Sequence, residues 1–148
     1  MSKKILFLTG TRADFGKIKS LIQILEAYPE FEPFIFVTGM HLQKEYGFTL
    51  LEVERCGFSN IHTFENHTHE TTMDLTLAKT IKGLSAYVKQ CEPDMIVIHG
   101  DRVEALAGAI VGSLNNILVA HIEGGEVSGT IDELIRHSTS KMSHVHFV

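Results

Sequence analysis

The feature that most constrains the fold is a regular alternation between short apolar runs and longer segments with a helical period. Short runs rich in β-branched and aromatic residues predict strands, and apolar residues at every third or fourth position predict helices. The expected strands are Ile5–Thr9, Phe34–Thr38, Asn60–Phe64, Met95–His99, Leu118–Ile122 and His144–Val148. The expected helices are Lys17–Tyr28, His41–Arg55 (a weaker pattern, interrupted by Gly47 and Thr49), Thr71–Cys91, Arg102–Leu114 and a segment that begins after Thr130.

Alternation of this kind predicts an α/β fold, with a mostly parallel six-stranded sheet, helices on both of its faces and right-handed crossovers. The 148 residues, 44% of them hydrophobic, suit about one domain with one core. No linker divides the chain, and Asn66–Thr72 is the clearest loop. Because the sequence stops at Val148, inside a predicted strand, we expect residues 1–148 to be the N-terminal part of a longer protein.

The composition excludes several classes of protein. The formal net charge is −5 and the basic residues form no dense stretch, which argues against a nucleic-acid partner. No apolar run approaches the roughly 20 residues that cross a bilayer, and Met1–Gly10 lacks the features of a signal peptide. Cys56 and Cys91 form no Cys-x-x-Cys pair, so neither a zinc site nor a disulfide framework is expected. We therefore expect a cytoplasmic protein.

The first predicted strand leads into a segment that carries Gly10, Arg12, Asp14 and Gly16. Backbone N–H groups at the start of the next helix, with Arg12 beside them, form an anion site. The glycine spacing matches neither the dinucleotide-binding fingerprint nor a P-loop, so no dinucleotide cofactor is expected. In the structural alternative, Asp14 caps the helix and Arg12 is a solvated loop residue.

The fourth predicted strand ends in His99-Gly100-Asp101-Arg102, at the start of another helix. A carboxylate at this place can act as a base or bind a hydroxyl group, and the planar guanidinium of Arg102 suits a phosphate. The alternative is again structural, with Asp101 as the N-cap and Arg102 on the surface of the first turn.

The fifth predicted strand is followed by Glu123-Gly124-Gly125. The two glycines let the backbone turn sharply or approach a ligand closely, which favours a site at Glu123. The alternative is an ordinary turn with a solvated acid.

The next helix begins with several polar residues. Thr130 and Glu133 have the spacing of a capping box, so a structural role is favoured for Glu133. Asp132 is free of that box, although it could pair with Arg136 one turn later, as Glu133 could with His137.

The acid-bearing segments follow strands one, four and five, whose carboxyl ends are expected at one edge of the sheet, where ligands bind in open α/β folds. Carboxylates and arginines in one crevice suit proton transfer at carbon on a phosphorylated substrate. The histidine pairs His67/His69 and His144/His146 lack a nearby third ligand in the sequence, and no metal is expected.

Three segments, Gly10–Asp14, His99–Arg102 and His121–His137, together resemble the hydrolysing UDP-N-acetylglucosamine 2-epimerases. The resemblance covers the whole chain and is strongest to the bacterial sialic-acid branch and to the epimerase half of the bifunctional epimerase/kinase. It implies a two-domain fold of the glycosyltransferase-B type, in which residues 1–148 form the N-terminal, Rossmann-like, three-layer α/β/α domain. The second, nucleotide-binding domain lies outside this chain.

The resemblance also implies a reaction that needs no cofactor. UDP is eliminated across C1 and C2 to give a glycal, and water then adds with inversion at C2, which releases UDP and N-acetylmannosamine. The implied catalytic carboxylates are Asp101, Glu123 and Asp132; one removes the C2 proton and the others handle the anomeric oxygen or orient water. The implied substrate-binding residues are Arg12, Asp14, Gly16, Arg102, Glu133, Arg136 and His137.

The sequence leaves two alternatives open. The substrate could instead be a UDP-diacetamido sugar or a GDP-linked sugar of legionaminic-acid synthesis. The chain could also be a non-catalytic nucleotide-sugar-binding domain, in which the acids serve as caps and ion pairs. The family commonly forms homo-oligomers, so we expect one for the full-length protein, and we expect the 148-residue piece alone to fold but to turn over little or nothing.

Overall fold

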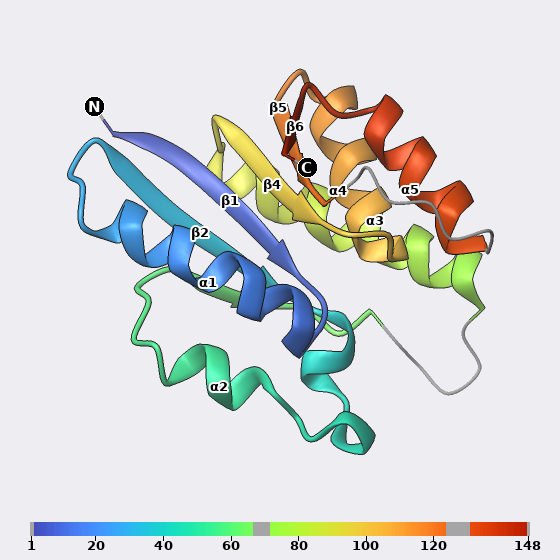
Figure 1. The fold of residues 1–148 in the computed structure, drawn as a ribbon, viewed down its shortest axis with the longest axis horizontal. Helices are drawn as coiled ribbons and strands as arrows, with labels where there is room; N and C mark the ends of the chain where they lie inside the picture. Colours follow the sequence, from blue (N-terminus) through green and yellow to red (C-terminus); the bar gives the residue numbers. More distant parts are fainter. Residues whose placement is uncertain (1, 67–71, 124–130, 148) are drawn as a thin grey trace.

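A computed structural model of the chain describes residues 2–66, 72–123 and 131–147, apart from the side chain of Asp132 (Figure 1). The described strands form a six-stranded sheet in the order β3-β2-β1-β4-β5-β6, and all five pairings are parallel. The strands are β1 (Lys3–Thr9), β2 (Phe31–Val37), β3 (Ile61–Thr63), β4 (Met95–His99), β5 (Leu118–Ile122) and β6 (Val145–Phe147). The helices are α1 (Arg12–Glu26), α2 (Leu50–Glu54), α3 (Met73–Cys91), α4 (Val103–Leu114) and α5 (Ile131–Lys141), with 3-10 turns η1 (Gly39–Leu42) and η2 (Lys44–Tyr46).

Helices cover both faces of this sheet, which confirms the predicted three-layer α/β/α fold. On one face α1 and α2 pack against β1, β2 and β4, with Phe15, Ile18 and Val53 in the core. On the other face α3 and α4 pack against the sheet, α5 lies beside α4, and Leu84 and Ala109 are fully buried. None of the helices in the described ranges is long and apolar enough to cross a membrane.

The start of α1 differs from the sequence prediction, which placed it at Lys17. The helix begins at Arg12 because Thr11 is its N-cap. The Thr11 hydroxyl accepts a hydrogen bond from the Asp14 backbone N–H at 3.1 Å, and the Asp14 carboxylate accepts one from the Thr11 N–H at 3.1 Å. This capping box satisfies two N–H groups at the helix start. The apolar period that predicted the helix begins only one turn later.

The prediction of a single helix at His41–Arg55 is also wrong. The segment instead forms η1, η2 and the short helix α2. Gly47 has φ +83° and Phe48 has φ +48°, so two successive residues adopt the left-handed conformation and end the 3-10 turn. The interruption at Gly47 in the sequence therefore marks a break in the backbone.

Helix α4 lies unusually close to the sheet. A Cβ atom added to Gly108 would come within 2.5 Å of the Ile98 side chain, and one added to Gly112 within 2.4 Å of the Val119 side chain. The Ala- and Gly-rich composition of α4 thus permits direct helix–sheet contact. This contact fixes the N-terminal end of α4 at the carboxyl edge of β4 and β5.

Candidate active site

Three of the sequence motifs meet at the carboxyl edge of the sheet. Strands β1, β4 and β5 are adjacent and parallel, so their carboxyl ends at Thr9, His99 and Ile122 lie side by side (Figure 1). The loop after β4 is joined to the end of β5 by a hydrogen bond from the Gly100 N–H to the Ile122 carbonyl, at 3.0 Å. The predicted convergence of acid-bearing segments at one edge is confirmed.

Glu123 is held between two basic side chains at this edge. Its Oε2 lies 2.9 Å from His99 Nε2, at the end of β4, and its Oε1 lies 3.6 Å from Lys17 Nζ, in α1. The Glu123 side chain is 39% exposed, so the carboxylate is accessible from solvent. Its backbone has φ +58°, a conformation that costs free energy in a residue other than glycine and that concentrates at functional sites.

Asp101 is paired with a buried arginine. Arg136 Nη1, in α5, donates to Asp101 Oδ2 at 3.2 Å, and the exposed fractions of the two side chains are 2% and 37%. In the part of the chain that the structure describes, Arg136 Nε and Nη2 have no hydrogen-bond partner. The guanidinium therefore keeps two buried nitrogen atoms without a partner next to Asp101, among the residues that the structure describes. The alternative of Asp101 as N-cap is wrong, because α4 begins at Val103 and its N-cap is Arg102.

His121 fixes the loop that carries Asp101. Its Nε2 lies 2.7 Å from the Gly100 carbonyl and its Nδ1 lies 3.0 Å from the Ser140 hydroxyl, so the ring joins β5, the β4–α4 loop and α5. Nε2–H donates to the carbonyl, and Nδ1 accepts from the hydroxyl. Burial lowers the pKa of His121, which favours this neutral form.

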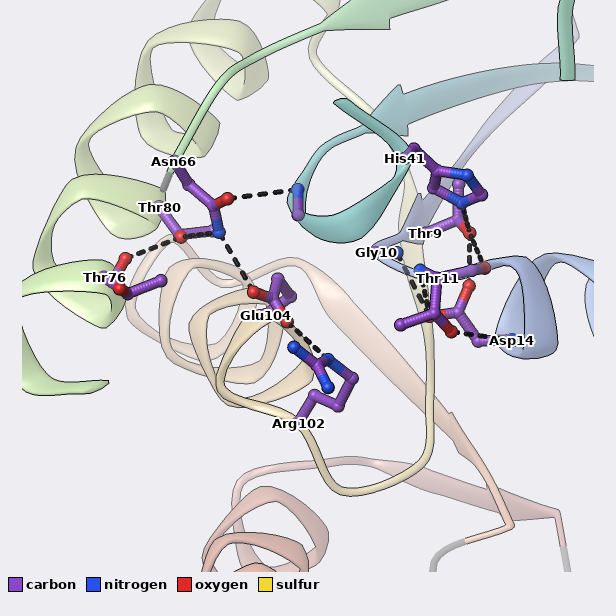
Figure 2. Close-up of polar contacts among 11 residues, drawn as sticks. Thr9, Gly10, Thr11, Asp14, His41, Asn66, Thr76, Thr80, Arg102 and Glu104 are labelled. Carbon is purple, nitrogen blue, oxygen red and sulfur yellow. Dashed lines mark hydrogen bonds and ion pairs between the residues drawn. The ribbon is translucent and has the colours of Figure 1, made fainter. Parts of the chain in front are cut away.

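Asp14 organises the β1–α1 turn. Its carboxylate accepts hydrogen bonds from the Thr9 hydroxyl and from the N–H groups of Gly10 and Thr11, the latter two at 3.1 Å each (Figure 2). Burial raises the pKa of Asp14, and the hydrogen bonds from Thr9, Gly10 and Thr11 oppose that rise. The contacts in the structure give Asp14 a local capping role, and its predicted contact with substrate stays a prediction.

Arg12 and Gly16 lie beside an open groove of about 620 Å³ between α1 and α2. Arg12 Nε pairs with Glu52 Oε2 at 3.1 Å and the arginine side chain is 74% exposed. A Cβ atom at Gly16 would meet nothing within 4 Å. The structure thus leaves Arg12 and Gly16 accessible, but no described contact joins them to Asp101 or Glu123.

Helix α5 carries the remaining predicted residues. His137 Nε2 lies 3.4 Å from Glu133 Oε1, which confirms that pair of the predicted ladder. The side chain of Asp132 lies outside the described residues, as do Thr130 and the predicted capping box. Arg136 pairs with Asp101, which lies in the loop between β4 and α4.

The described residues contain no group of three or more side chains that could hold a metal ion. His144 Nδ1 accepts a hydrogen bond from the Val119 N–H at 3.0 Å and so ties the start of β6 to β5. His67 and His69 lie outside the described residues.

A second polar cluster, made of Asn66, Thr80, Arg102 and Glu104, was not predicted (Figure 2). Glu104 is buried at the start of α4 and accepts hydrogen bonds from Arg102 Nε and Asn66 Nδ2, both at 3.0 Å. An acid in a helix that is otherwise apolar was the available signal at position 104. Asn66 offered no comparable signal, because it begins the predicted loop.

His41 is a further buried polar residue that the sequence did not single out. Its Nε2 lies 2.9 Å from the Thr9 hydroxyl and its Nδ1 lies 2.8 Å from the Thr49 hydroxyl. Burial lowers the pKa of His41 to about 4. The ring therefore stays neutral where an exposed histidine would take up a proton.

The lowered pKa of His41 predicts that the folded chain is less stable at acid pH. Between the unfolded pKa of 6.5 and the folded value of about 4, the unfolded state binds more protons, so protonation favours unfolding. From pH 7.5 to pH 5, His41 is expected to lower the free energy of unfolding of the 148-residue chain by about 2 kcal/mol. Urea titrations at both pH values would measure this loss. His41→Gln should lose about 2 kcal/mol less than the wild type, and an equal loss in both would contradict the assignment.

The sequence matches known proteins along its whole length. Residues 23–148 match the family described as UDP-N-acetylglucosamine 2-epimerase. A UDP-N-acetylglucosamine 2-epimerase of Neisseria meningitidis serogroup B is 52% identical over 146 residues, which are 99% of this chain and 39% of that protein. A hydrolysing UDP-N,N'-diacetylbacillosamine 2-epimerase of Legionella pneumophila is 39% identical over an alignment of 153 positions, which covers 100% of this chain and 40% of that protein.

The structure is similar to a crystal structure of the Methanocaldococcus jannaschii UDP-N-acetylglucosamine 2-epimerase in complex with UDP-N-acetylglucosamine and UDP. The TM-score is 0.81 at 26% identity, and the match covers 95% of this chain and 38% of that one. This similarity agrees with the expected Rossmann-like half of a glycosyltransferase-B-type fold. The chain spans about two fifths of the length of the curated relatives that it matches.

Proposed function

The chain belongs to the UDP-N-acetylglucosamine 2-epimerase family, and we propose that it is the N-terminal domain of a hydrolysing enzyme that makes UDP and N-acetylmannosamine. The observation that carries this proposal is the pair of accessible carboxylates at one sheet edge, each beside basic groups. Glu123 lies between His99 and Lys17, and Asp101 lies beside Arg136. Such an arrangement suits proton transfer on a substrate that also carries negative charge.

The proposed reaction has two steps that need no redox chemistry. A carboxylate takes the proton from C2, the electron pair forms the C1–C2 double bond, and the C1–O bond to UDP breaks. Water then adds its oxygen to C1, and C2 receives a proton on the opposite face. Asp101, Glu123 and Asp132 are the proposed proton-transfer and water-orienting groups. The bond between His121 and the Gly100 carbonyl supports this role for Asp101, because it fixes the loop.

Cations would stabilise the departing diphosphate and hold the sugar. Arg102, Arg12 and the backbone N–H groups at the start of α1 are proposed to contact phosphate oxygens. Arg136 and His137 are proposed to line the sugar site, with Glu133 as the partner that orients His137. Asp14 and Gly16 would shape the turn that approaches the substrate. A second domain is proposed to supply the uridine contacts and to exclude water.

The choice of sugar follows the degree of similarity. The Neisseria relative named for UDP-N-acetylglucosamine is 52% identical, and the Legionella relative named for the diacetylbacillosamine sugar is 39% identical. We therefore favour UDP-N-acetylglucosamine as substrate, in the synthesis of sialic-acid-type sugars. A cytoplasmic, homo-oligomeric full-length protein remains part of this proposal.

The test uses the full-length gene product with UDP-N-acetylglucosamine, UDP-N,N'-diacetylbacillosamine and GDP-N-acetylglucosamine in D₂O. We expect UDP release, free N-acetylmannosamine and deuterium at C2 with the first sugar. The 148-residue chain alone should release little or no UDP, because half of the proposed cleft is missing. Faster turnover of another sugar would overturn the substrate assignment. Binding without turnover of any sugar would favour a non-catalytic domain, and full activity of the 148-residue chain would contradict the two-domain proposal.

A further inference from the structure

We propose that Glu104 is a positioning residue, which holds the guanidinium of Arg102 so that its two terminal amino groups face the diphosphate of the substrate. This inference rests on the proposed function, because it concerns the anion that Arg102 would bind. Glu104 itself does not touch the substrate in this proposal. It acts by fixing the direction of a neighbouring side chain.

The contact between Glu104 and Arg102 uses only one edge of the guanidinium. Arg102 Nε donates to Glu104 Oε1 at 3.0 Å, and the exposed fractions of the two side chains are 42% and 5%. In the described part of the chain, no other residue binds the Arg102 guanidinium. The edge formed by Nη1 and Nη2 can also bind two phosphate oxygens, and no residue in the described part of the chain occupies it.

Glu104 is itself fixed from a second side. Its Oε2 accepts a hydrogen bond from Asn66 Nδ2 at 3.0 Å, and Asn66 is fully buried. Asn66 Nδ2 also donates to the Thr80 hydroxyl at 2.8 Å, and its Oδ1 accepts from the Gly39 N–H at 3.0 Å (Figure 2). The carboxylate is therefore anchored by the loops after β2 and β3 and by α3.

The turn after β1 completes this anchor. A Cβ atom at Gly10 would lie 3.3 Å from both Cγ and Oε1 of Glu104, so the glycine leaves room for the buried carboxylate. The Gly10 carbonyl in turn accepts from the Met40 N–H at 2.8 Å. The loops after β1, β2, β3 and β4 thus meet around Glu104. Of its two side-chain partners in the described residues, Asn66 is fully buried and Arg102 is 42% exposed.

A purely local role makes a different prediction. An acid in the first turn of α4 stabilises the helix through its dipole, and that role does not require any particular neighbour. Such a residue would affect the melting temperature without a specific effect on diphosphate affinity. A residue that acts through Arg102 should lose its effect once Arg102 is gone.

A double-mutant cycle in the full-length protein separates the two roles. We expect Glu104→Gln to weaken UDP binding, measured by calorimetry, about tenfold and to raise KM for UDP-N-acetylglucosamine by a similar factor. Arg102→Ala should weaken UDP binding at least as much, and the double variant should be no weaker than Arg102→Ala alone. Glu26→Gln, an exposed acid at the far end of α1, is the matched control and should bind as the wild type does.

Two results would overturn the inference: unchanged UDP affinity in Glu104→Gln, and additive losses of affinity in the double variant. Glu104→Asp keeps the carboxylate but shortens the side chain. It replaces Glu104→Gln in the test if the glutamine variant does not fold. Its loss of UDP affinity should be smaller than that of Arg102→Ala. A wild type that binds UDP without releasing it from the sugar nucleotide would refute the proposed function and leave this cycle decisive. A wild type that binds no UDP would refute both.

Discussion

Replacing Glu123 by glutamine in the full-length protein is expected to lower the rate of UDP release from UDP-N-acetylglucosamine by about 10³-fold. The amide has nearly the same shape as the carboxylate and can still accept a hydrogen bond from His99, which lies 2.9 Å away in the wild type. It cannot take up a proton in the way that the proposed elimination or hydration requires. The expected effect is therefore on kcat, with a smaller change in KM.

This prediction is checked by initial rates of UDP release, and exchange of the C2 proton in D₂O tests the step itself. Glu26→Gln is the matched control, since Glu26 lies at the end of α1 away from the carboxyl edge. Melting temperatures of both variants establish that they are folded. Retention of more than a tenth of the wild-type rate in Glu123→Gln would remove Glu123 from the proposed catalytic groups.

Arg136→Met is expected to make the protein more stable and nearly inactive. Arg136 is 2% exposed, and only its Nη1 has a partner, Asp101, in the described residues. A buried cation with unpaired donors costs free energy, and an apolar side chain of similar length removes that cost. Asp101 is 37% exposed, so water can solvate it after the substitution. We expect the free energy of unfolding to rise by about 2 kcal/mol and kcat/KM to fall by about 10²-fold.

Urea unfolding of the 148-residue chain and steady-state kinetics of the full-length protein measure the two effects separately. Arg12→Met is the control for stability, because Arg12 is 74% exposed in its pair with Glu52 and such pairs contribute little. A gain in stability together with a loss of activity would mean that Arg136 is retained for a ligand. A loss of several kcal/mol would instead show that the fold depends on its pairing with Asp101.

The sequence was sufficient for the architecture of this domain because strand and helix periods are local properties. Six strands appeared within a few residues of their predicted places. Helix starts and irregular turns were harder to predict from the sequence. The capping box at Thr11 and the left-handed residues at Gly47 and Phe48 depend on side-chain and backbone geometry that the apolar period does not contain.

The sequence by itself determined that Asp101, Arg102 and Glu123 follow strand ends, and strand–helix alternation then brought those ends to one edge. Only the tertiary structure decided which side chains meet there. The Arg136–Asp101 and Asn66–Glu104 contacts join residues 35 and 38 positions apart. Contacts over such separations depend on strand order, register and helix packing, and burial in the folded chain then determines which charges are paired and which donors remain free.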